Sequence, residues 1–105
     1  MVITVDLGTQ PASVWLDHPQ DFRAFVVSIR NAGQLPADSL PALVASFGRL
    51  EDDEHVFVDR EALVGMAGRY GGDPGWLQGL AGMIAYATSK GWVDESGAIR
   101  AHIQA

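Results

Sequence analysis

The sequence predicts a small α+β domain in which a strand and a helix precede a helix, a strand, two further helices and a β-hairpin. Three patterns predict this class: apolar–polar alternation over residues 2–7, apolar residues at helical spacing over 74–90, and two short apolar runs around a turn at 92–103. The chain has 105 residues, of which 48% are hydrophobic and 19% charged, as in one globular domain with a modest core. We therefore expect a single domain over 1–105, with 1–38 as an N-terminal extension and 39–105 as the core.

The N-terminal extension is expected to contain a strand and a helix. Ile3, Val5 and Leu7 share one side of the alternating segment, which predicts a strand with one buried face. The segment 14–16 is either a second short strand or a packed loop. Asp17 is placed to begin a helix that Gly33 ends. The apolar stripe of that helix consists of Phe22, Phe25, Val26 and Ile29.

The first half of the core is expected to be a helix, an acidic turn, a strand and a second helix. Ser39 can cap the first helix, which runs to about residue 50. Its buried stripe consists of Leu40, Leu43, Val44, Phe47 and Leu50. The acidic turn at 51–54 is followed by the apolar run 55–58, which predicts a short strand. Asp59 can cap the next helix, over 60–70.

The last third of the chain is expected to be a long helix and a hairpin. Asp73 and Pro74 form a strong cap and first residue for a helix that extends to about Lys90. Gly91 ends this helix, and the apolar runs on both sides of 94–97 then predict the hairpin. Gly97 can supply the positive φ that the hairpin turn requires.

The order of elements over residues 39–103 resembles the winged-helix fold. The stretch HVFVDREALVGMAG resembles the step from the first strand to the second helix of such domains, and MIAYATSKGWVDESGAI resembles the end of the third helix running into the wing. The resemblance implies a winged-helix-like core with a strand and a helix from the first 33 residues packed against it. It concerns architecture rather than activity, because many unrelated functions use this fold.

Composition excludes several function classes. The chain has 13 acidic against 7 basic residues, a formal charge of −6, whereas nucleic-acid binders usually carry a positive footprint. With no cysteine, disulfides, thiolate zinc sites and thiol catalysis are excluded. No apolar run approaches the roughly 20 residues of a membrane span, and no basic region precedes the first apolar residues. We expect a cytoplasmic protein without a membrane partner; the single lysine and abundant alanine and glycine are typical of a GC-rich bacterium.

The predicted third helix has few side chains suited to reading DNA. In winged helices this helix usually enters the major groove, where its side chains reach the base edges. Only Gln78 is suited to that role here, while Lys90 and Arg100 could contact phosphate. Asp94 and Glu95, at the predicted wing tip, would repel the DNA backbone. We therefore do not expect nucleic acid as a partner, and a dimeric DNA-binding transcriptional regulator is kept as an alternative.

Glycines mark one side of the same helix. Gly75, Gly79 and Gly82 lie close to one stripe that Tyr86 continues, and each glycine inside a helix costs about 0.5–1 kcal/mol relative to alanine. A smooth helix face lets another backbone approach closely. The face can therefore contact a protein partner or a second copy, or it can receive the N-terminal extension, and the sequence leaves both open.

No pattern in the sequence marks a catalytic, cofactor or metal site. His55 and His102 are expected to be cross-strand neighbours on a face with Phe57 and Arg100, which could hold a metal, but no ligand spacing supports one. The acidic turn at 51–54 lacks the alternating ligands of a calcium loop. No Ser–His–acid arrangement is apparent. We expect no enzyme activity, no cofactor and no metal.

The sequence thus favours a small, acidic, non-catalytic protein-interaction or regulatory module that binds a protein partner or associates with itself. The acidic turn 51–54 and the turn 94–97 are further candidate contact surfaces. The alternatives are the dimeric DNA-binding regulator and a small-ligand-binding or enzyme accessory domain with an apolar pocket near Trp15 and Trp92. The predicted partner-binding residues are Gly75, Gln78, Gly79, Gly82, Tyr86, Lys90 and Arg100.

Overall fold

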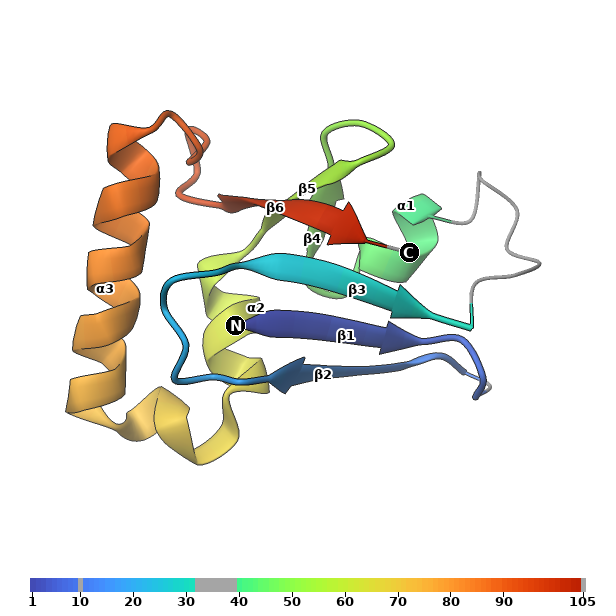
Figure 1. Ribbon diagram of the computed structural model, residues 1–105, viewed down its shortest axis with the longest axis horizontal. Coiled ribbons are helices and arrows are strands. Elements are labelled where there is room, and N and C mark those ends of the chain that lie inside the picture. Colours follow the sequence, from blue (N-terminus) through green and yellow to red (C-terminus); the bar gives the residue numbers. More distant parts are fainter. Residues whose placement is uncertain (10, 32–39, 105) are drawn as a thin grey trace.

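The computed structural model describes residues 1–9, 11–31 and 40–104, which form a mixed six-stranded sheet with helices behind it and at one end (Figure 1). The strands are β1 (Val2–Asp6), β2 (Ser13–Asp17), β3 (Val26–Arg30), β4 (Gly48–Leu50), β5 (His55–Val58) and β6 (Ile99–Gln104). The helices are α1 (Leu40–Val44), α2 (Arg60–Met66), the 3₁₀ turn η2 (Gly68–Gly72) and α3 (Pro74–Ser89). The strand order is β2-β1-β3-β6-β5-β4.

Three parallel strands occupy the middle of the sheet. β3 is parallel to β1 on one side and to β6 on the other, while β2 and the β5–β4 pair are antiparallel to their neighbours. In this register Val26 lies between Val2 and His102, and His102 pairs in turn with His55. The last strand of the chain therefore joins an N-terminal half-sheet to the half formed by β4 and β5.

One face of the sheet carries the hydrophobic core. Helices α1 and α2 lie behind this face, and α3 crosses the end of the sheet at which β3 and β6 begin (Figure 1). Every second residue of the central strands points into the core, as expected for strands with one covered face. The core side chains from the sheet are Ile3, Val5, Val27, Ile29, Val56, Val58, Ile99, Ala101 and Ile103, and those packed on them include Val44, Phe47, Leu63, Trp76 and Leu80.

The opposite face is not covered by any helix of the described residues (Figure 1). It nevertheless buries one polar side chain, since Thr4 is only 1% exposed. The Thr4 hydroxyl donates to Oδ2 of Asp17 at 2.6 Å, and the Trp15 indole N–H donates to the same oxygen at 2.9 Å. The bond from Thr4 ties β1 to β2 on the otherwise open face, and the bond from Trp15, which is on β2 itself, holds the Asp17 carboxylate in place.

The winged-helix prediction is wrong. A winged helix is rich in helix with a two-stranded wing, whereas this chain builds one six-stranded sheet in which the expected wing strand, β6, is central. The expected hairpin partner contributes only an isolated bridge between Val93 and Ile99. The turn itself forms as predicted: Gly97 has a φ of 88°, and Asp94 Oδ1 accepts from the amides of Ser96 and Ala98.

The helix predicted to begin at Asp17 is also wrong. Asp17 ends β2, and the residues of the predicted helical stripe lie partly in the β2–β3 loop and partly in β3. The run Val26–Ile29 is β-branched at three of four positions, and burial alternates along it, with Val27 and Ile29 inside. This segment pairs with β1 on one side and β6 on the other, and that pairing favours an extended backbone. Tertiary pairing therefore overrides the helical spacing of its apolar residues. The predicted helix end, Gly33, lies outside the described residues.

The helix predicted over 39–50 is much shorter than expected. α1 stops at Val44, and β4 begins at Gly48. An added Cβ at Gly48 would lie 2.0 Å from the carbonyl oxygen of Phe57, so glycine is required where β4 approaches β5. The predicted cap Ser39 and the boundary between residues 38 and 39 lie outside the described residues.

Several elements match the sequence prediction. The first strand, β5 and the long helix α3 occur where expected, and Asp73 caps α3 by accepting from the amide of Gly75 at 2.9 Å. Asp59 occupies the first cap position of α2, but its side chain makes no capping hydrogen bond. These segments are the ones in which local turn chemistry and hydrophobic spacing agree.

The Asp17 carboxylate is expected to make a pH-dependent contribution to the free energy of unfolding. The hydrogen bond from Thr4, and secondarily that from Trp15, lowers the pKa of Asp17 below its ordinary value. A group with a lowered folded pKa stabilises the fold above its unfolded pKa and loses that contribution as pH falls through the folded value. We expect the stability difference between wild type and Asp17→Asn to be largest at neutral pH and to shrink below about pH 5. Urea unfolding from pH 7 to pH 3 measures it, and a difference that stays constant would contradict the account.

Candidate functional site

A pocket of about 280 Å³ lies between the second half of α3, the start of β6 and the loop joining β2 to β3. We call it the α3 pocket. It is lined by Phe22, Arg23, Ala24, Phe25, His55, Met83, Tyr86, Ala87, Trp92, Ile99, Arg100 and His102. Its walls therefore come from segments far apart in the sequence, which the sheet topology brings together.

The loop wall of the pocket is held by hydrogen bonds to two other parts of the chain. The indole N–H of Trp76, on α3, donates to the carbonyl oxygen of Pro19 at 2.7 Å. The nitrogen of Met1 donates to the carbonyl oxygens of Asp21 and Ala24 at 2.7 and 2.8 Å. The loop is thus tied to both the helix and the first strand, which positions the pocket residues at 22–25.

Phe22 packs directly onto the helix surface at Gly79. A Cβ added at Gly79 would lie 2.4 Å from Cε2 of Phe22, so only glycine leaves room for the ring in this position. The Phe22 and Trp76 rings are also tilted against each other, with centroids 6.2 Å apart. Gly79 therefore receives the N-terminal part of the chain, which is one of the two roles left open for the glycine stripe.

Two exposed aromatic side chains form the outer wall of the pocket. Tyr86 is 59% exposed and Trp92 40% exposed, and their rings meet edge to face with centroids 6.1 Å apart. The ammonium of Lys90 lies 5.6 Å from the centre of the Tyr86 ring, which is a cation–π distance. Large aromatic surfaces left in contact with water are characteristic of binding sites.

The polar side of the pocket comes from β5 and β6. His55 and His102, which pair across the two strands as predicted, have ring centroids 5.3 Å apart in an edge-on arrangement. Arg100 forms an ion pair with Glu51 at 3.0 Å. Its Nε is buried without a hydrogen-bond partner among the described residues, although buried donors are usually paired.

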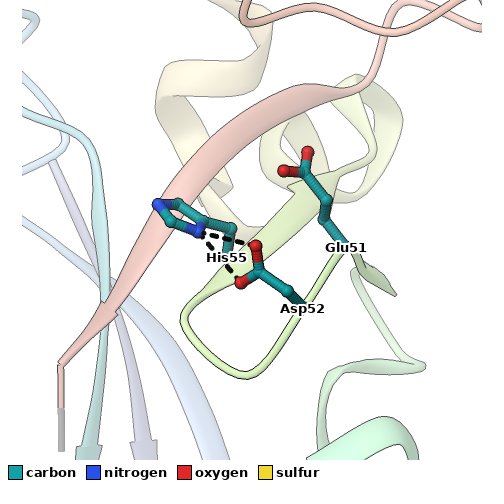
Figure 2. Close-up of side chains that lie close together, drawn as sticks. All are labelled: Glu51, Asp52 and His55. Atoms are coloured by element: carbon teal, nitrogen blue, oxygen red, sulfur yellow. Dashed lines mark hydrogen bonds and ion pairs between the residues drawn. The ribbon is translucent and has the colours of Figure 1, made fainter.

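Two acidic residues, Glu51 and Asp52, lie close to His55 (Figure 2). His55 Nδ1 is 2.9 and 3.2 Å from the two carboxylate oxygens of Asp52. The amide of Glu54 donates to Asp52 at 2.8 Å, and this bond, followed by that of His55, lowers the pKa of Asp52. Ligand atoms of Glu51, Asp52 and His55 lie within 4.8 Å of one another, so these side chains could bind a cation. Because Asp52 is already bonded to His55 and Glu51 to Arg100, the arrangement also serves to orient the pocket's His55 and Arg100.

The structure divides the predicted partner-binding residues between two places. Tyr86 and Arg100 line the α3 pocket, and Lys90 lies against Tyr86. The others lie along α3: Gly79 is covered by Phe22, whereas Gln78 is exposed and an added Cβ at Gly82 would meet no atom within 4 Å. An added Cβ at Gly75 would meet only the side chain of its own cap, Asp73.

The sequence predicted a pocket near Trp15 and Trp92, and only one of these two side chains lines the α3 pocket. Trp92 lines the α3 pocket, but Trp15 points onto the open sheet face, where it binds Asp17. The sequence prediction missed the loop residues 22–25 because it placed them in a helix. Pro19 within the segment HPQD was the available signal for a turn at this point.

Comparison with known proteins found no match to a protein-family model, to a curated protein or to a solved structure. Within residues 1–9, 11–31 and 40–104, none of the helices combines the length and the hydropathy required to cross a bilayer. The site is therefore interpreted from its own geometry.

Gly79→Val is expected to displace Phe22 from the pocket wall, because the new side chain would occupy the position of the ring. The Trp76 indole N–H, which packs against Phe22 and donates to Pro19, should then change its chemical shift in a ¹H–¹⁵N spectrum. Gly82→Val, in the same helix but facing open space, is the matched control and should leave that signal in place. Equal shifts in the two variants would show that Phe22 does not pack at Gly79.

Proposed function

We propose that this protein is a non-catalytic regulatory module that binds a small organic molecule in the α3 pocket. The observation that carries the proposal is a concave site of about 280 Å³ whose lining is apolar and aromatic apart from two arginines and two histidines. Such a combination, apolar walls with a few convergent polar groups, is typical of small-molecule sites. The proposal includes a cytoplasmic location, which the lack of cysteine supports.

The lining supports binding rather than catalysis. Among the described residues, no serine, threonine, aspartate or glutamate lines the pocket, so the usual hydroxyl nucleophiles and carboxylate bases do not face a bound molecule. His55 lines the pocket and is held by Asp52, but the described lining offers no serine, threonine or cysteine side chain for it to activate. The side chains therefore provide shape and charge rather than a nucleophile–base pair.

A protein contact through the outer face of α3 is a second candidate function. It is favoured by the exposure of Tyr86 and Trp92 and by the open space at Gly82, which would let a partner backbone approach closely. Tyr86 belongs both to this face and to the pocket lining. Occupation of the pocket would therefore alter the surface that such a partner contacts, which is what a regulatory module requires.

The DNA-binding alternative loses its structural basis. It depended on a winged-helix arrangement in which α3 and a wing approach the duplex together, and β6 is instead inside the sheet. Arg100, one of its three proposed contact residues, is paired with Glu51.

Binding is tested by a ¹H–¹⁵N titration with three single-ring probes: phenylethanol, phenethylamine and phenylacetate. At least one should give saturable shifts confined to residues 22–25, 83–87 and 92–102. Trp92→Ala should weaken that binding about fivefold to tenfold, because it removes an aromatic wall. Gln78→Ala, exposed on α3 outside the pocket lining, should leave the affinity unchanged. Absence of saturable shifts with all three probes at millimolar concentration would overturn the proposal.

The second candidate is tested by mass measurement in solution. If the outer face of α3 mediates self-association, light scattering should show a molar mass that rises with protein concentration. Gly82→Leu should return the protein to the monomer, because its side chain would fill the open space. A mass equal to one chain at all concentrations up to about millimolar would rule out self-association through this face.

A further inference from the structure

The charged side chains that line the α3 pocket are basic, whereas the chain as a whole is acidic. The protein carries 13 acidic and 7 basic residues, yet the described lining contains Arg23, Arg100 and two histidines and no carboxylate. Clefts lined by one sign of charge concentrate ligands of the other sign. The composition of the lining therefore favours an anion.

Within the pocket, Arg23 is the cation available for a ligand. Arg100 is already paired with Glu51, whereas among the described residues the guanidinium of Arg23 takes part in no ion pair. Arg23 is exposed and lies on the loop that Met1 and Trp76 hold in place. An arginine fork binds a carboxylate through two parallel hydrogen bonds, so the loop presents a ready carboxylate anchor.

The remaining walls select a flat apolar group. Phe22 and Phe25 lie on the same loop as Arg23, and two further aromatic lining residues, Tyr86 and Trp92, come from α3 and the segment that follows it. Aromatic side chains pack well against another ring, stacked or edge to face. The volume of about 280 Å³ is at the small end of the range for small-molecule sites, which suits a single ring with a short acidic arm.

We infer that the α3 pocket binds a small aromatic carboxylate, with the carboxylate on Arg23 and the ring between Tyr86, Trp92 and the loop phenylalanines. This inference rests on the proposed function, a small-molecule site, and names the chemical class of its ligand. Arg100 keeps its ion pair with Glu51, and its Nε remains a donor without a partner among the described residues.

The test compares phenylacetate with phenylacetamide, which has nearly the same shape but no charge. Titrations followed by ¹H–¹⁵N spectra should show phenylacetate binding at least tenfold more tightly than the amide. Arg23→Gln should weaken phenylacetate binding about tenfold and leave the amide nearly unaffected, since only the charged bond is lost. Arg69→Gln is the matched control, because Arg69 lies over Tyr70, outside the pocket lining, and its loss changes the net charge equally.

The outcomes separate this inference from the proposed function. Equal binding of the acid and the amide, or tighter binding of phenethylamine than of phenylacetate, would overturn the carboxylate assignment and leave a small-molecule site in place. Equal weakening by Arg23→Gln and Arg69→Gln would show a general charge effect and would also overturn it. A pocket that responds to none of the probes would remove both proposals together.

Discussion

The pairing of β6 between β3 and β5 is the constraint on which the rest of the structure depends. β6 is parallel to β3 and antiparallel to β5, and it is the only strand of the described residues that contacts both halves of the sheet. The amide of Ile103 also donates to the carbonyl oxygen of Glu54 at 2.6 Å, which extends this junction beyond β5. Without β6, the core side chains of β1 and β3 would lose their continuation across the sheet, and the fold would separate into two small sheets with exposed edges.

The same pairing creates the α3 pocket. Because β6 begins directly after the turn that follows α3, its first residues lie beside the end of that helix, and Arg100 and His102 reach the pocket lining. β5 adds His55 through its register with His102, and the β2–β3 loop closes the remaining side with Phe22, which is seated on Gly79. The pocket is thus a direct consequence of the sheet order, and its positive lining in an acidic chain is its most specific chemical property.

Sequence-based prediction succeeded for features that depend on interactions between neighbouring residues and failed for those that depend on pairing between distant segments. The cap at Asp73, the turn at Gly97 and the strand β1 depend on local features, and the structure confirms them. The long-range pairings were not visible: Val26–Arg30 reads as helix or strand by spacing, and only its parallel neighbours decide between them. For the site, the pairing of His55 with His102 and a pocket wall at Trp92 were predicted, whereas Phe22, Arg23 and Phe25 required knowledge of how their loop returns to α3.

The central claim is that a small aromatic molecule occupies the space between the end of α3 and the start of β6. Intermolecular NOE spectroscopy on the phenylacetate-saturated protein tests it most directly, because magnetisation transfer between protons reports contacts within about 5 Å. We expect magnetisation transfer from the phenylacetate ring protons to the methyl groups of Met83, Ala87 and Ile99, all of which line the pocket. Transfer instead to Val14 or Leu16, at the far edge of the sheet, or to no methyl group at saturation, would contradict it.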